Sequence, residues 1–295
     1  SCHDYGWREL RERLEPGCYD YKPAPAVPEP APEVVEREEA PAPGADVAAM
    51  EAAISGTPLG ELCNAFASVA MPPLPLALTL PKAMALCALA ASGQADGVPD
   101  TWVGVSRSRI YIDTAGGQCP NIYTVCASPS ASGKDIGELL GRYCAERGWH
   151  LGDAGSAEGI VEGLQAQSPA LLNITEFEKW LSADTWQGAS TSMLTEIYSK
   201  GYIKQRFSSR KGQAAFRECR YAFPVVYANV QPEVFSEKAT ELGISSGFFN
   251  RFAYCVSRTV GRFRPAPGFS YRETEARITA ALASLEQAAG AVDVP

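Results

Sequence analysis

The residues best placed for chemistry lie in a turn of small residues that follows a short β-branched run. Residues 123–127 have the composition of a strand, and the chain then reads Ser-Pro-Ser-Ala-Ser-Gly-Lys-Asp over 128–135. A strand, such a turn and a helix start cradle phosphates, because the backbone N–H groups converge on the anion and a lysine reaches the outer phosphates. The sequence therefore predicts a phosphate-binding loop. Its candidate residues are Ser128, Ser130, Ala131, Ser132, Gly133, Lys134 and Asp135.

Two positions depart from the usual G-x-x-x-x-G-K-[ST] pattern. Ser128 stands where the first glycine belongs, and Asp135 stands where a hydroxyl normally holds Mg²⁺. The Asp135 carboxylate can ligate Mg²⁺ itself, since this ion prefers hard oxygen ligands, or it can repel the phosphates. The plainer interpretation is an ordinary strand–turn–helix connection. Against it, a lysine at a helix N-terminus is unfavourable unless an anion is bound.

A second set of polar residues follows the apolar run at 170–174. A strand that ends in Asp-Glu typically orients the metal with the Asp and polarises the attacking water with the Glu. Here Thr175 occupies the Asp position and Glu176 remains. Glu176 is thus a candidate catalytic residue and, with Asp135, a candidate Mg²⁺ ligand. The alternative is a strand edge followed by a capped helix.

Two further side chains could act on a γ-phosphate. Asn229 follows a predicted buried strand at 223–228 and could position the attacking water, or equally cap the helix that opens at Pro232. Arg251 lies among aromatic residues and, in an oligomer, could reach a neighbour's γ-phosphate. A structural salt bridge is the alternative for Arg251.

A basic stretch interrupts this acidic chain and is interleaved with Tyr202 and Phe207. Its candidate residues for nucleic-acid contact are Lys200, Lys204, Arg206, Arg210 and Lys211. Cations beside aromatic rings suit contact with the DNA backbone together with base stacking. A solvated hairpin is the alternative, because charge runs are often only solvated faces.

Composition narrows the class of protein. The 295 residues are 46% hydrophobic with a formal net charge of −8, which permits a sizeable core and argues against a wholly basic nucleic-acid-coating protein. Nine cysteines and two histidines occur without a C-x-x-C pair, so zinc-site spacing is absent. The odd cysteine count without a signal-peptide pattern indicates a cytoplasmic setting. No apolar run approaches the ~20 residues that cross a bilayer, so no membrane contact is expected.

The chain divides by composition into successive regions. Residues 1–20 are expected to be the tail of a preceding module, and 21–45 a Pro/Ala/Glu-rich linker. A helical N-terminal region follows at 46–99, then an ATPase core at 100–265 and a C-terminal helix at 266–295. Predicted strands at 100–113, 170–174, 223–228 and 252–256 alternate with helices at 135–149, 156–165, 176–181, 191–198 and 232–242. This alternation predicts a three-layer α/β fold with a mainly parallel central sheet.

These motifs, in this order, resemble a family of RecA/AAA+-like P-loop ATPase domains from phage, prophage and plasmid primase–helicase proteins. The likeness covers roughly residues 55–265. Its anchors are the segments 120–123, 129–135, 156–160, 175–177, 194–198 and 246–252. The resemblance implies that Lys134 binds phosphate, Glu176 serves the water, Asn229 acts as a sensor and Arg251 as a trans-acting finger. Members resembling this chain can carry Asp after the lysine, whereas Thr175 departs from the family's Asp.

The expected function is therefore that of an ATP-binding and ATP-hydrolysing helicase-type DNA replication protein of a phage or mobile element. ATP and Mg²⁺ are its expected cofactors, and single-stranded DNA, a homo-oligomeric ring and an upstream primase module its expected partners. The alternative is a catalytically degenerate P-loop module that binds nucleotide or a partner without turnover. A terminase- or packaging-type motor is a third possibility.

Overall fold

The computed structural model describes part of the chain in detail. The described residues are 44–91, 121–130, 132–133, 138–152, 156–181, 186–208, 214–219, 222–239, 247–257 and 263–289. The predicted tail and most of the predicted linker, together with the predicted strands at 100–113, lie outside these ranges. So do five candidate site residues. These are Ala131, Lys134, Asp135, Arg210 and Lys211.

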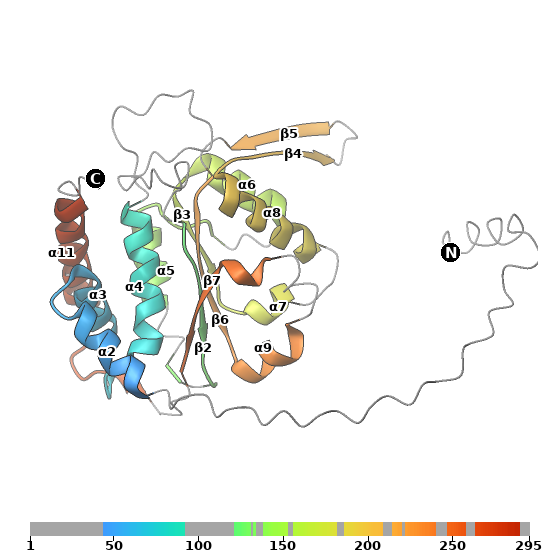
Figure 1. The fold of residues 1–295 in the computed structure, drawn as a ribbon. Coiled ribbons are helices and arrows are strands. Elements are labelled where there is room, and N and C mark those ends of the chain that lie inside the picture. The colour runs from blue at the N-terminus through green and yellow to red at the C-terminus, as the bar shows by residue number, and fades with distance from the viewer. Residues whose placement is uncertain are drawn as a thin grey trace, which may run out of the picture. The chain divides into compact units, whose positions relative to one another are not determined.

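A parallel four-stranded sheet forms the centre of the fold (Figure 1). Its strands are β2 (Tyr123–Ala127), β3 (Ala170–Ile174), β6 (Pro224–Val230) and β7 (Phe252–Val256), in the order β3-β6-β2-β7. All neighbouring pairs are parallel. A single parallel bridge from His150 to Leu171 continues the sheet beyond β3. The predicted mainly parallel sheet is confirmed.

Nine α-helices of the described residues surround this sheet. They are α2 (Gly44–Ile54), α3 (Pro58–Ala67), α4 (Leu76–Ala91), α5 (Glu138–Glu146), α6 (Ala157–Ala166), α7 (Phe177–Leu181), α8 (Trp186–Lys200), α9 (Pro232–Lys238) and α11 (Tyr271–Ala289). Side-chain caps fix two starts: Thr57 Oγ1 accepts from Gly60 N at 3.2 Å, and Ser156 Oγ accepts from Gly159 N at 3.1 Å. Within the described ranges, none of the helices has the length and apolarity that crossing a bilayer requires.

Helices cover both faces of the sheet (Figure 1). Successive side chains of a strand point to opposite faces of the sheet. Because these strands are apolar along most of their length, both faces of the sheet are apolar, as expected for a parallel sheet covered on both sides. One face packs on α4 and α5, with α3 and α11 behind α4; the other packs on α6, α7 and α8. The first core includes Leu62, Leu86, Cys126, Leu140, Tyr227 and Ile278. The second includes Val125, Ile160, Leu172, Phe177, Leu194 and Val226.

The helix α4 contains an internal proline, Pro81, and polar side chains of β2 contact the helix next to it. Pro81 lacks an N–H, so the Ala77 carbonyl four residues earlier has no helical donor. The Cys126 thiol on β2 donates to that carbonyl, with 3.8 Å between Sγ and O. Thr124 Oγ1, also on β2, lies 3.5 Å from the Pro81 carbonyl oxygen. The interruption of the helix thus faces polar atoms of the central strand, which explains how a helix with an internal proline remains buried.

Two small antiparallel pairs flank the main sheet. β1 (Ala70–Met71) pairs with β8 (Arg264–Pro265), which joins the segment before α4 to the segment before α11. β4 (Ile203–Ser208) and β5 (Ala214–Cys219) form a hairpin whose base packs on α6 and α8. Figure 1 shows this hairpin extending past the end of these helices. The basic stretch therefore forms a hairpin, as its alternative interpretation predicted.

We predict that Leu86→Ala lowers the free energy of unfolding by about 2–5 kcal/mol, because it opens a cavity between α4 and the sheet. Leu86 is fully buried in the first core. Urea unfolding followed by circular dichroism measures the loss. Val47→Ala on α2 is the control, since Val47 is 46% exposed and its loss should stay within about 0.5 kcal/mol. Similar losses in both variants would contradict this account of the core.

Candidate phosphate-binding site

The predicted loop leaves the sheet at the carboxyl end of β2, between two neighbouring strands. Ser128 N donates to Val230 O of β6 at 3.0 Å, and Ser257 N donates to Ala127 O at 2.8 Å. The start of the loop is therefore tied to the ends of both neighbouring strands, β6 and β7. Open α/β sheets bind their ligands outside the carboxyl ends of the strands. The strand predicted before the loop is confirmed, and it is central in the sheet.

A buried pair of hydroxyls closes the first half of the loop. Ser128 and Ser132 are almost completely buried, and Ser132 Oγ donates to Ser128 Oγ at 2.7 Å. The two hydroxyls thus bond to each other away from water, as buried polar groups require. Ser128, which replaces the usual glycine, has a structural part in this loop. Ser130 lies between them and is exposed.

Gly133 has a conformation and a packing that disfavour any side chain. Its φ is +82°, in the left-handed region. A Cβ added there would lie 2.9 Å from Leu74 Cδ2 and 3.2 Å from Phe263 Cδ2. Leu74 follows β1 and Phe263 precedes β8, so the small β1–β8 sheet brings two apolar side chains against the loop. The loop is therefore held between the segments that precede and follow the main sheet.

Glu176 is level with the start of the loop at the carboxyl edge of the sheet. Ile174 of β3 pairs with Ala228 of β6, and Ala228 pairs with Val125 of β2. Ala127 follows Val125 by two residues, just as Glu176 follows Ile174. Because two strand spacings lie between β3 and β2, about 10 Å separates the backbones in this row. The predicted edge position of Glu176 agrees with the register.

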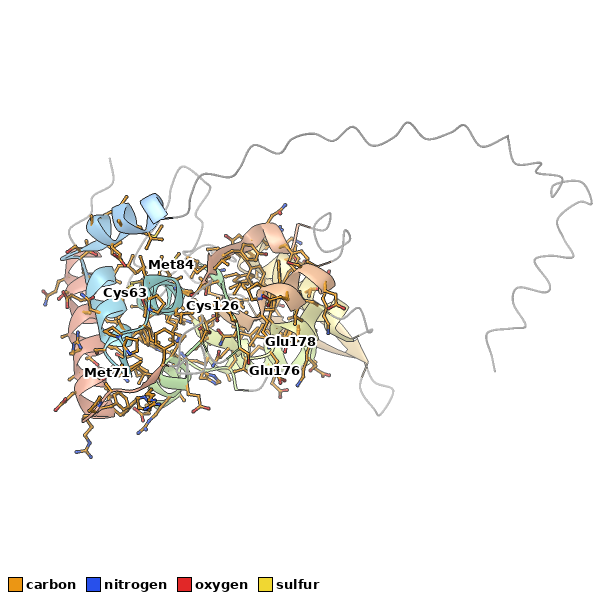
Figure 2. All side chains as sticks on the ribbon, turned by 90° about the horizontal axis from the view of Figure 1, so that it is seen from below. Cys63, Met71, Met84, Cys126, Glu176 and Glu178 are labelled. Atoms are coloured by element: carbon orange, nitrogen blue, oxygen red, sulfur yellow. The ribbon has the colours of Figure 1, made fainter. Side chains whose placement is uncertain are left out.

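The Glu176 side chain is exposed and already has a cationic partner. It is 54% exposed and forms an ion pair with Lys179, one turn further along α7. The hydrogen bond to this carboxylate raises the pKa of the Lys179 ammonium. Figure 2 shows Glu176 beside Glu178 and well away from Met71 of β1. A metal or a water molecule at Glu176 would therefore have to compete with an exposed ion pair, which water and salt weaken.

Asn229 lies inside β6 and not after it, because this strand runs two residues beyond the predicted end. Its side chain is 4% exposed, and its Oδ1 accepts a hydrogen bond from Tyr227 Oη at 2.9 Å. Burial raises the pKa of Tyr227 well above its ordinary value, which keeps this donor protonated. Gln231 is the N-cap residue of α9, without a side-chain cap bond. The capping alternative for Asn229 is therefore wrong.

Asn173 is a half-buried polar residue of β3 that was not among the predicted site residues. It lies opposite Tyr227 of β6. Its Oδ1 is buried without a hydrogen-bond partner among the described residues. Its Nδ2 lies 3.1 Å from the point that a Cβ on Gly141 of α5 would occupy. The sequence could have indicated this residue, because Asn173 is the one polar residue in the apolar run 170–174.

Arg251 ends the 3₁₀-helix η3 (Phe249–Arg251) and is held by its own chain. Nη1 donates to Gly247 O at 2.5 Å, and Nη2 donates to Ser199 Oγ at 3.0 Å. Its Nε is buried with no hydrogen-bond partner in the described part of the chain. These hydrogen bonds go to neutral oxygens and not to a carboxylate. To reach a neighbouring subunit, Arg251 would have to release both of them.

The described lysines of the basic stretch have acidic neighbours. Lys200 lies at the end of α8 and pairs with Glu196 at 2.7 Å, and Lys204 on β4 pairs with Glu218 on β5 at 3.3 Å. Both lysine side chains are more than half exposed. Such exposed pairs contribute only about 0–1 kcal/mol, so a phosphate could replace either carboxylate. Arg206 follows on β4, two residues after Lys204.

Of the two predicted Mg²⁺ ligands, Glu176 lies within the described residues and Asp135 lies outside them. Across the described ranges, no three His, Cys, Asp or Glu side chains gather in a way that could hold a metal. Mg²⁺ is commonly held by one or two carboxylates together with substrate phosphates and water. Glu176 is exposed and lies at the same edge of the sheet as the loop, so its carboxylate could be one such ligand.

Comparison of the chain with family models, with curated proteins and with solved structures finds no match. The interpretation of the site therefore depends on its residues and geometry.

We predict that Gly133→Ala lowers the free energy of unfolding by about 2–4 kcal/mol, because a Cβ adds both left-handed strain and a clash with Leu74. Thermal or urea unfolding measures the loss. Gly56→Ala is the matched control: its φ is +72°, but a Cβ there meets nothing within 4 Å. The control should lose only the strain, about 1–2 kcal/mol. Equal losses would show that Leu74 and Phe263 do not hold the loop.

Proposed function

We propose that this protein is a P-loop ATPase of the RecA/AAA+ type that binds ATP at residues 128–135 and acts in DNA replication as a helicase-type motor. The observation that carries the proposal is the position of the loop. It leaves the carboxyl end of a fully buried central parallel strand and contains a glycine in the left-handed region. Backbone N–H groups in such a turn are suited to binding phosphate oxygens, and Lys134 would neutralise the outer phosphates.

The strand order supports a hydrolytic arrangement. β6 lies between β2, which carries the loop, and β3, which precedes Glu176. Asn229 near the end of β6 is therefore flanked by the loop on one side and by the Glu176 strand on the other. In the proposed mechanism Glu176 polarises the attacking water and Asn229 helps to position it. Asp135 and Glu176 would hold Mg²⁺ together with the phosphates, and the ion would supply charge neutralisation when bound.

The proposed DNA contact lies on the β4–β5 hairpin and the end of α8. The hairpin extends from a base anchored by Ile203 and Cys219, which are buried in the second core. The phosphates of single-stranded DNA would be contacted by Lys200, Lys204 and Arg206, with Arg210 and Lys211 between the strands. We further propose a ring of identical subunits, in which Arg251 acts on the neighbour's nucleotide, and an upstream primase module.

A second candidate function is favoured by the surroundings of Glu176. Its carboxylate is exposed and paired with Lys179, and Thr175 precedes it in place of an acid. An active general base needs a position next to the attacking water and freedom to accept its proton. A P-loop module that binds nucleotide for assembly, without turnover, needs neither. The two candidates share the loop and differ in hydrolysis.

Phosphate release with and without single-stranded DNA separates the two candidates. For the motor we expect DNA-stimulated turnover in the wild type and a loss of at least about 100-fold in Lys134→Ala, because one preorganised charge contact is removed from the transition state. Nucleotide binding is measured in parallel by calorimetry. Binding without turnover would support the assembly module. A wild type that binds no nucleotide would overturn both candidates.

The hairpin is tested by the salt dependence of DNA binding. If Lys204 and Arg206 each contact a phosphate, Lys204→Ala and Arg206→Ala should each weaken binding and reduce the slope of log affinity against log salt by about 0.7. Arg272→Ala on α11 is the control, since Arg272 is an exposed cation remote in sequence from the hairpin. Unchanged affinity and slope in the hairpin variants would leave a plain solvated hairpin.

A further inference from the structure

A largely apolar cavity of about 300 Å³ lies between the start of α5, the β1–β8 sheet and the start of α11. Its apolar lining comes from Val69, Leu139, Pro265, Phe269 and Tyr271. Phe269 is 43% exposed, so its ring is accessible from the cavity. An aromatic ring beside an open cavity offers a surface for another flat ring.

One wall of the cavity contains an arginine that lies over a tyrosine ring. The guanidinium carbon of Arg142 lies 3.6 Å from the centre of the Tyr271 ring. Glu146 holds both members, since Arg142 Nε donates to its Oε1 at 3.0 Å and Tyr271 Oη donates to its Oε2 at 2.8 Å. These two hydrogen bonds restrict the pair before a ligand binds, which lowers the cost of ordering it. Arginine planes and aromatic rings are both surfaces on which bases stack.

The same structural elements form the cavity and hold the phosphate loop. Phe263, which contacts the Cβ position of Gly133, is two residues from Pro265 of the cavity wall, about 7 Å along an extended chain. Glu138 and Leu139, also in the wall, begin the helix that follows the loop. The loop and the cavity therefore adjoin the same short segment, 263–265, and the helix that follows the loop begins in the cavity wall.

We propose that this cavity receives the base of the nucleotide whose phosphates bind the loop. The proposal rests on the proposed function, because it needs a nucleoside triphosphate at residues 128–135. The base would stack on Phe269 and on the Arg142 plane, with Leu139 excluding water. The exposed Glu138 carboxylate at the cavity can accept a hydrogen bond from an exocyclic amino group, such as that of adenine.

Calorimetric titration of the full chain with ATP and with inorganic triphosphate tests the proposal. Phe269→Ala should weaken ATP binding on the order of tenfold, since it removes one stacking surface, and should leave triphosphate binding unchanged. Arg142→Lys should act in the same direction, because it keeps the charge and removes the plane. Tyr254→Ala is the matched control: Tyr254 is 40% exposed on β7 and should affect neither ligand.

The outcomes distinguish this inference from the proposed function. A wild type that binds triphosphate as tightly as ATP would overturn the base site and leave the phosphate loop standing. Equal weakening of both ligands by Phe269→Ala, or no weakening of ATP, would also overturn the base site. A wild type that binds neither ligand would overturn the proposed function and this inference with it. Selective weakening of ATP alone would support both.

Discussion

The packing of α4 against the parallel sheet is the interaction on which the rest of the structure depends. α4 contacts all four strands and carries α3 and α11 on its outer side. Its internal proline would ordinarily destabilise a buried helix, because a carbonyl loses its donor. The Cys126 thiol of β2 donates to that carbonyl, while the Thr124 hydroxyl beside it donates to Val226 O of β6 at 3.1 Å. The strand that leads into the candidate phosphate loop is thus positioned by a helix that precedes it by many residues.

The described part of the loop is held by contacts with this arrangement of strands. Its start is bonded to the ends of β6 and β7, its serine hydroxyls bond to each other, and Gly133 packs against Leu74 and Phe263. Ser128 in the place of a glycine is accommodated by this hydroxyl pair. The segments before and after the main sheet meet in β1 and β8, and Val69 before β1 and Pro265 of β8 form part of the wall of the apolar cavity. One small sheet therefore links the proposed phosphate and base sites.

The strands were the most predictable part of the fold. The runs at 170–174 and 252–256 were predicted with their observed bounds, because continuous apolar segments mark buried parallel strands. β6 runs past its predicted end through Asn229, since a hydrogen bond from buried Tyr227 makes an amide acceptable inside a strand. α8 is longer than predicted, beginning at Trp186 and not at 191. The predicted helix at 156–165 differs by a residue at each end, where Ser156 is the N-cap.

The sequence by itself determined the class of fold, the place of the candidate loop after a buried strand, and the residue types available at the sheet's edge. Those properties follow from local pattern and composition. Only the tertiary structure decided that β6 lies between the loop and Glu176, that Arg251 is held by Ser199 and Gly247, and that the Oδ1 atom of Asn173 is buried without a hydrogen-bond partner among the described residues. Strand order and the contacts of a long side chain depend on residues distant in the chain, and local patterns do not encode them.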